Sequence, residues 1–134
     1  MSGNFLKIGE LAKETGTPIE TIRYYERAGL LPAPTRSAGN YRLYTEPHRD
    51  RLQFIRRCRS LDMALDEVRT LLSLREAQEA PCAEVNDLLD RHIGTISARI
   101  VELRLLQRQL TALRSSCRSI QAIEHCEILK ALSN

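Results

Sequence analysis

The feature that most constrains the fold is a long periodic segment in the second half of the chain. Apolar residues recur there at intervals of four and three, from Val85 to Leu113, and form a heptad pattern over about four repeats. His92 and Arg99 occupy two of the core positions. A helix of about thirty residues is roughly 45–50 Å long, and a chain of 134 residues cannot cover its apolar stripe. We therefore expect a helix from about Cys82 to Leu113 that pairs with a second copy, either antiparallel or parallel.

The beginning of the chain predicts two short helices. Residues 8–15 (IGELAKET) place apolar side chains on one face, and Gly16 is suited to end this helix because glycine accepts the left-handed conformation. We expect Thr17 to be the N-cap of a second helix that has Pro18 at its first position and ends near Ala28. Two short helices joined by a tight turn that contains glycine form a helix-turn-helix.

The segment that follows changes character. Pro32 and Pro34 exclude a continuing helix, and the alternation across residues 41–44 predicts a short strand. We expect a two-stranded wing beside the helix-turn-helix. Apolar periodicity then predicts helices over residues 46–60 and 65–77.

The sequence therefore predicts a mainly α-helical chain in three parts. Residues 5–80 are expected to form a winged helix-turn-helix DNA-binding domain with connecting helices. Residues 81–113 form the dimerisation helix. Residues 114–134 form the C-terminal part, with a polar loop over 114–126 and a last short helix over 128–132.

Basic charge is concentrated in the first half of the chain. The net charge is only +3, but between residues 23 and 59 nine arginines stand against three acidic residues. The guanidinium offers a planar fork of donors that suits phosphates and base edges. Together with the predicted helix-turn-helix, this charge makes the first half of the chain a candidate for binding double-stranded DNA.

Other functional classes have no support in the sequence. It contains no Walker, GxGxxG, HExxH or CxxC pattern, so we expect a protein that is not an enzyme. No apolar run reaches the roughly 18 residues of a membrane span. The N-terminal residues lack the apolar stretch of a secretory signal. We therefore expect a cytoplasmic protein with no membrane partner.

The second helix carries two candidates for DNA contact, Arg23 and Tyr24, at the position of a recognition helix. Because Tyr24 and Tyr25 are neighbours on a helix, their side chains diverge by about 100° and cannot both face the core. We expect Tyr24 to point outward and Tyr25 inward. Contact with phosphates or the minor groove is also expected of three residues in or beside the wing, Arg36, Tyr41 and Arg42.

The four cysteines are candidates for reduced thiols or metal ligands, since nothing indicates secretion and their spacings are wide. Cys82 begins the long helix, whereas Cys117 and Cys126 follow its other end with eight residues between them. In an antiparallel dimer the start of one helix meets the end of the other, so three thiolates would converge and select a soft ion. Spacing alone favours three unrelated free thiols over such a site. Cys58 has no partner in this arrangement and is expected to pack as a small apolar residue.

The sequence resembles the MerR family of transcription regulators, and within it the cadmium- and lead-responsive branch. The resemblance extends over residues 5–132 and is carried by IGELAKETG, ETIRYYERAGLLP, RSAGNYRLY and RLQFIRRCRSLDM, together with Cys82 and the pair Cys117 and Cys126. It implies a winged helix-turn-helix, a long antiparallel coiled-coil dimerisation helix and a C-terminal metal-binding loop.

The resemblance also implies ligands and a mechanism. Arg59 falls at the family's position for clamping the DNA backbone, and the metal ligands would be Cys82, Cys117 and Cys126. The expected ion is Pb²⁺ or Cd²⁺, with Hg²⁺ and Zn²⁺ as alternatives. Such homodimers bind a palindromic operator inside a promoter, and metal binding makes them distort the DNA so that RNA polymerase can engage it. The genes controlled are typically those of metal efflux or resistance.

Some positions depart from the family's pattern and leave alternatives open. Thr17 stands where several lead- and cadmium-responsive relatives carry Cys, and Ser116 stands where zinc-responsive relatives have the first of two adjacent cysteines, which counts against zinc. His125 adjoins Cys126 and is a candidate fourth ligand, although a solvated loop histidine is the simpler interpretation. The rival functions are a Hg²⁺-responsive regulator, a redox sensor that uses Cys117 and Cys126, and a zinc-carrying storage protein.

Overall fold

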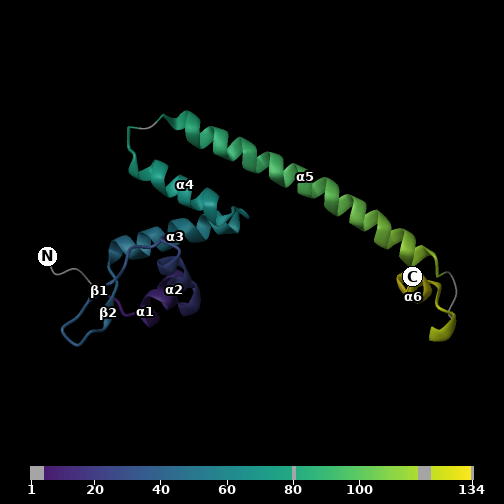
Figure 1. Cartoon of the computed structure of the whole chain (residues 1–134), viewed down its shortest axis with the longest axis horizontal. Coiled ribbons are helices and arrows are strands. Elements are labelled where there is room, and N and C mark those ends of the chain that lie inside the picture. The colour runs from purple at the N-terminus through teal and green to yellow at the C-terminus, as the bar shows by residue number, and fades with distance from the viewer. Residues whose placement is uncertain (1–4, 80, 118–121, 134) are drawn as a thin grey trace. The chain divides into compact units, whose positions relative to one another are not determined.

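The computed structural model describes residues 5–79, 81–117 and 122–133 (Figure 1). The chain divides into two compact units, residues 1–85 and residues 86–134. Among the described residues, no helix combines the length and the apolar character needed to cross a bilayer.

The first unit is a helical domain with a small antiparallel wing. Its helices are α1 (Ile8–Thr15), α2 (Ile19–Arg27), α3 (Glu46–Ser60) and α4 (Leu65–Glu76). The wing consists of β1 (Thr35–Arg36) and β2 (Arg42–Leu43), which pair antiparallel with Thr35 opposite Leu43. These elements confirm the predicted winged helix-turn-helix, and α1 and α3 have the predicted bounds.

The core of this unit draws on every one of its helices and on the wing. Fully shielded side chains come from each of them, namely Leu11, Ile22, Tyr44, Leu52, Ile55 and Val68. Burial of a leucine or isoleucine side chain contributes about 1.5–3 kcal/mol. The shared core therefore fixes the helix-turn-helix and the wing relative to each other.

The turn between α1 and α2 depends on Gly16, which adopts a left-handed φ of 65° as predicted. Helix α2 begins at Ile19, and its N-cap is Pro18 rather than Thr17. The prediction that Thr17 caps α2 is therefore wrong. Its buried hydroxyl instead donates a hydrogen bond of 3.5 Å to the carbonyl of Thr15, at the end of α1.

The wing loop is closed by its own hydrogen bonds. The N–H of Ser37 donates to the carbonyl of Tyr41 at 2.8 Å, and the N–H of Asn40 donates to the carbonyl of Ser37 at 2.9 Å. The N–H of Tyr41 donates to Oγ of Ser37 at 3.0 Å. Asn40 has a φ of 64°, a conformation that asparagine tolerates better than most residues. At the base of the wing, Tyr44 and Leu6 exchange two backbone hydrogen bonds of 2.8 Å.

His48 anchors the start of α3. The N–H of Thr45 donates to Nδ1 of His48 at 3.1 Å, so a neutral ring carries its proton on Nε2 and donates it to the carbonyl of Pro32, also at 3.1 Å. The ring of His48 meets the ring of Tyr44 edge-on, with centroids 5.2 Å apart. The start of α3 is thus attached to both sides of the wing.

The second unit contains most of α5 (Cys82–Ser115), a 3-10 turn (Ile123–His125) and α6 (Glu127–Ser133). The predicted long helix is confirmed and extends two residues past its expected end. The predicted loop over 114–126 is correspondingly shorter, and residues 118–121 of it lie outside the described part of the chain. The heptad leucines 103, 106 and 110 are between 52% and 66% exposed, so one chain leaves this stretch of the stripe uncovered.

Candidate nucleic-acid interface and thiol site

Helix α2 presents Arg23 and Tyr24 to solvent. Tyr24 is 47% exposed, whereas Tyr25 is 8% exposed and packs in the core, which confirms the predicted directions of the two tyrosines. Nη1 of Arg23 lies 3.4 Å from the carboxylate of Glu20, one turn earlier. The open face of α2 therefore offers a guanidinium and a phenol as neighbours.

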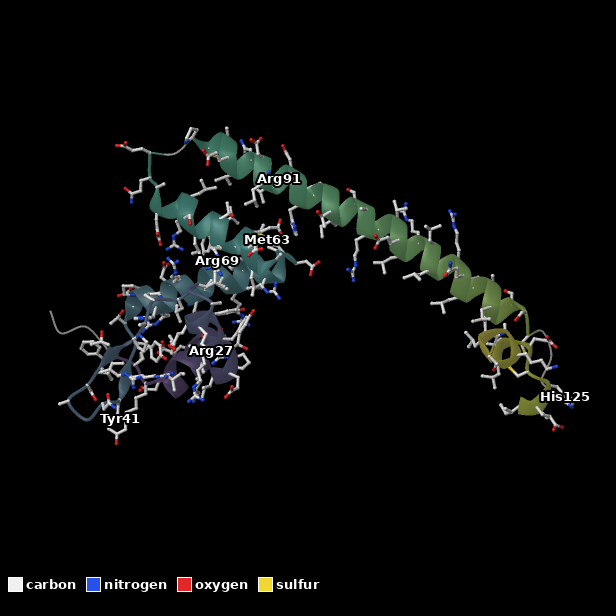
Figure 2. All side chains as sticks on the ribbon, in the orientation of Figure 1. Arg27, Tyr41, Met63, Arg69, Arg91 and His125 are labelled. Atoms are coloured by element: carbon white, nitrogen blue, oxygen red, sulfur yellow. The ribbon has the colours of Figure 1, made fainter. Side chains whose placement is uncertain are left out.

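The wing offers a second open surface. Tyr41 projects from the wing loop and is 66% exposed (Figure 2). Nζ of Lys7 lies 5.8 Å from the centroid of its ring. Arg36 is exposed, and its Nη1 donates to the carbonyl of Asn40 at 3.2 Å, which orients the guanidinium. Side chains of these types make most of the contacts between proteins and the sugar–phosphate backbone of DNA.

A single carboxylate joins the wing to α2. The side chain of Glu26 is 12% exposed; its Oε1 accepts a hydrogen bond from the hydroxyl of Tyr44, and its Oε2 lies 3.5 Å from Nη1 of Arg42. Burial of Tyr44, followed by its contacts with Glu26, raises the pKa of this phenol to about 12. The hydroxyl therefore remains a donor to Glu26 at neutral pH.

Arg59, near the end of α3, is the residue predicted to clamp the DNA backbone. It is exposed, and its Nη1 donates to the carbonyl of Met63 at 2.7 Å. This bond orients the guanidinium and uses one of its five N–H donors. The side chain is thereby held in a defined direction at the surface.

Two further arginines fix the ends of the helix-turn-helix. Nη1 of Arg56, on α3, donates to the carbonyl of Thr15, the last residue of α1, at 2.7 Å. Nη2 of Arg69, on α4, donates to the carbonyl of Ala28, just past α2, at 2.7 Å (Figure 2 labels Arg69). Carbonyls at helix ends have no partner within the helix, so these arginines satisfy and position the ends of both α1 and α2.

Two of the candidate thiols meet beyond the end of α5. Cys117 follows that helix by two residues, Cys126 directly precedes α6, and the two side chains are hydrogen-bonded to each other. The backbone N–H of Leu129 lowers the pKa of Cys126; desolvation opposes this shift, while the N–H of Ile128 and the thiol of Cys117 support it. A lowered pKa favours the thiolate, which is the form that binds metal ions.

The third candidate, Cys82, lies at the other end of α5. It is exposed and is the first residue of a helix of 34 residues, which is about 50 Å long. One ion therefore cannot contact both Cys82 and the later thiols of the same chain. The described residues of one chain contain no group of three His, Cys, Asp or Glu side chains placed to hold a metal. The paired thiols fit a soft ion in their chemistry but provide only two ligands.

The structure also describes His125 and Cys58. The side chain of His125, labelled in Figure 2, is 63% exposed, and its Nε2 lies 3.3 Å from the carboxylate of Glu124. This agrees with a solvated loop histidine. Cys58 is buried in the core of the first unit, where burial raises the pKa of its thiol, and the predicted apolar packing is confirmed.

Comparison with known families identifies the fold. The profile of the MerR HTH family of regulatory proteins matches residues 6–75, and the MerR DNA-binding profile matches residues 49–113. The chain belongs to the MerR family.

Three known MerR-type proteins are similar to this chain over most of its length. One is the transcription regulator PbrR691 from Ralstonia metallidurans CH34, whose crystal structure was solved in complex with lead(II). Its sequence is 51% identical to this chain, and the two structures superpose with a TM-score of 0.81 over 95% of this chain and 98% of that one. The HTH-type transcriptional regulator ZntR homolog of Haemophilus influenzae is 49% identical over 109 residues, 81% of each chain. The mercuric resistance operon regulatory protein of Bacillus cereus is 39% identical over 94% of this chain and 96% of its own length.

Membership of the MerR family establishes the general activity. The chain is a metal-sensing transcription regulator, as predicted, and its relatives are regulators rather than enzymes. Among the solved relatives, a MerR family regulator that lacks the sensor domain was crystallised bound to promoter DNA, and PbrR691 was crystallised with lead(II). The names of the relatives include both lead and mercury. The names of the relatives therefore do not assign one ion to this chain.

Sequence reasoning missed the residues whose partners lie far along the chain. Glu26 is separated from Tyr44 by 18 positions, and Arg69 is separated from Ala28 by 41. No local pattern reveals such pairs. The available signal for Glu26 is its position four residues after Ile22, a buried residue of α2, because residues four apart share one face of a helix.

Proposed function

We propose that this MerR regulator activates metal-resistance or efflux genes in response to Pb²⁺ or Cd²⁺. The observation that carries the proposal is the hydrogen-bonded pair of Cys117 and Cys126, in a chain 51% identical to a regulator solved with lead(II). Thiolates are soft ligands and select soft ions. Ser116 beside Cys117 offers no additional thiol. This favours an ion satisfied by three ligands over Zn²⁺, which takes four in structural sites.

The complete site requires two copies of the chain. We infer that Cys82 of one protomer joins Cys117 and Cys126 of its partner in an antiparallel dimer. Two facts support this: a single chain brings only two of the thiols together, and α5 leaves much of its leucine stripe uncovered. A C2 dimer then holds two equivalent sites.

We propose that DNA is contacted by the open faces of α2 and the wing and by the end of α3. We assign the contacts to six residues, namely Arg23, Tyr24, Arg36, Tyr41, Arg42 and Arg59. Metal binding is proposed to make the bound dimer distort the promoter, so that RNA polymerase can use promoter elements that were out of alignment. Such distortion acts through the shape and deformability of the DNA.

Mixed dimers test the shared site. Subunits carrying Cys82→Ser are combined with subunits carrying Cys117→Ser and Cys126→Ser, and heterodimers are purified through two different affinity tags. Each heterodimer has one site with all three thiols and one with none, so it should bind about half the Pb²⁺ of the wild-type dimer. Both mutant homodimers should bind none with high affinity. A heterodimer that also fails to bind Pb²⁺ excludes the shared site.

A control variant and a competition between ions complete the metal titration. Cys58→Ala removes a thiol that is buried in the core of the first unit, and it should leave metal stoichiometry unchanged. Ultraviolet thiolate-to-metal charge-transfer bands, followed on the reduced dimer during competition between Pb²⁺, Cd²⁺, Hg²⁺ and Zn²⁺, rank the ions. A wild-type preference for Zn²⁺ or Hg²⁺ over both Pb²⁺ and Cd²⁺ would contradict the proposed ion.

The hydrogen bond between Cys117 and Cys126 also supports a second candidate function, that of a redox sensor. Hydrogen peroxide would convert the two thiols into one disulfide and two molecules of water. Under this alternative, peroxide rather than metal changes transcription. Promoter activity measured with each agent separately distinguishes the two functions.

A further inference from the structure

We propose that Glu26 is a positioning residue for DNA recognition, which holds Arg42 of the wing in register with α2. This inference rests on the proposed function, because it requires that α2 and the wing both contact DNA. Glu26 does not itself face the open side of α2. Its proposed role is to fix the position of the guanidinium of Arg42, which contacts DNA.

One carboxylate, that of Glu26, links α2 to β2 and to the residue that follows β2. Glu26 lies on α2, Arg42 on β2, and Tyr44 at the base of the wing next to β2. One oxygen accepts the hydroxyl of Tyr44, and the other lies 3.5 Å from Nη1 of Arg42. Tyr44 is fully shielded and pairs through its backbone with Leu6, so it is a rigid support for the carboxylate.

Glu26 and Arg42 differ in solvent exposure, and this difference assigns them different roles. The side chain of Glu26 is 12% exposed, whereas that of Arg42 is 38% exposed. The carboxylate is therefore anchored inside while the guanidinium reaches the surface. A guanidinium without such an anchor is drawn to any phosphate, and contacts with phosphates carry no sequence information. Anchoring Arg42 restricts it to one direction and so favours the correct register on the operator.

Removing the charge of Glu26 tests this role. Glu26→Gln keeps an oxygen that accepts from Tyr44 but loses the charge that holds Arg42. Arg42→Gln removes the guanidinium itself. Glu14→Gln is the matched control, because Glu14 pairs with Arg49 at 2.9 Å and its loss changes the net charge equally, in a pair that includes no residue of the wing or α2.

The measurement compares two duplexes of equal length. One is the palindromic duplex that the wild-type dimer selects from a random-sequence library, and the other is a scrambled version. For Glu26→Gln, we expect the ratio of the two affinities to fall at least fivefold. Affinity for the scrambled duplex should be unchanged or higher, and its salt dependence should steepen by up to about 0.9 in log–log slope, the effect of one freed cation. The ratio for Glu14→Gln should stay within about twofold of wild type.

A double-mutant cycle then assigns the effect to Arg42. In the Arg42→Gln background, Glu26→Gln should change the affinity ratio by less than about twofold, because residues that act through one interaction are not additive. Additive losses would overturn the proposal. So would an unchanged ratio in Glu26→Gln, or equal losses on both duplexes with unchanged salt slopes, which indicate a role in stability alone. A wild-type dimer with no preference for any duplex would instead refute the proposed function.

Discussion

The guanidinium of Arg56, on α3, donates a hydrogen bond of 2.7 Å to the carbonyl of Thr15 at the end of α1. The next residue, Gly16, has a φ of 65°, and a Cβ added there would lie 2.5 Å from Nη1 of Arg56. The left-handed backbone therefore favours glycine at this position, and a larger side chain would also displace the guanidinium of Arg56. The turn of the helix-turn-helix and the arginine that caps it form one structural unit.

Replacement of this glycine should weaken the first unit. Gly16→Ala places a side chain in the left-handed region and against Arg56, and we expect it to lower the free energy of unfolding by about 1–2 kcal/mol. Gly9→Ala is the matched control, since Gly9 lies within α1 and nothing is within 4 Å of an added Cβ. It should leave stability unchanged or raise it by about 0.5 kcal/mol. Urea unfolding followed by circular dichroism measures both, and equal stability of the two variants would contradict the prediction.

Loss of either exposed side chain of α2 should weaken operator binding. Arg23→Ala or Tyr24→Ala is expected to cost about 1–3 kcal/mol of specific binding, with metal stoichiometry unchanged. Lys13→Ala, which removes a cation from α1, controls for the change in charge. Fluorescence anisotropy with labelled operator provides the affinities. Wild-type affinity in both variants would remove α2 from the interface.

Binding to DNA and activation should separate at the thiol site. A Cys117→Ser dimer lacks one soft ligand, but its helix-turn-helix is unaltered. We expect it to occupy the promoter with wild-type affinity and to leave transcription silent when Pb²⁺ is added. Footprinting and in vitro transcription on the same template measure the two properties. Release of the wild-type protein from DNA by Pb²⁺ would show derepression instead of activation by distortion.

Tyr44 should ionise later than an ordinary tyrosine. Its pKa is raised from 10.0 to about 12 in the folded protein. The stabilisation linked to its proton is therefore complete below pH 10 and is lost as the pH rises through 12. In an ultraviolet titration of the native protein, one of the four tyrosines should ionise in this late phase. Tyr44→Phe should lack the phase, and its presence in that variant would assign it to another residue.

Local patterns were sufficient to predict the helices and the directions in which the side chains of Tyr24 and Tyr25 point. Heptad spacing predicted α5 because a helix of that length repeats one face many times. Gly16 marked the end of α1 because few other residues accept its φ. The divergence of Tyr24 and Tyr25 followed from helix geometry alone. Each of these features depends only on neighbours within a few residues, which the sequence displays directly.

The remaining features depend on contacts between distant residues. Thr17 was predicted to be an N-cap from its neighbours, but its hydroxyl serves the preceding turn in the buried environment of the domain. The contacts of Glu26 require α2 to be packed against the wing, and the contact of Arg56 requires α3 to be packed against α1. No local spacing encodes either arrangement. The cysteine spacings gave three candidate ligands, but only the structure brings Cys117 and Cys126 into contact.

The hydrogen bonds described for the wing loop come from the loop itself and from Arg36, the strand residue that precedes it, so the loop can be exchanged as a unit. The bonds described among Ser37, Asn40 and Tyr41 all begin and end within the loop, and the strands that carry it are two residues each. Loops of other lengths or sequences can therefore be grafted between Arg36 and Arg42 without repacking the core. A library of such grafts provides a route to regulators of this scaffold with altered operator preference.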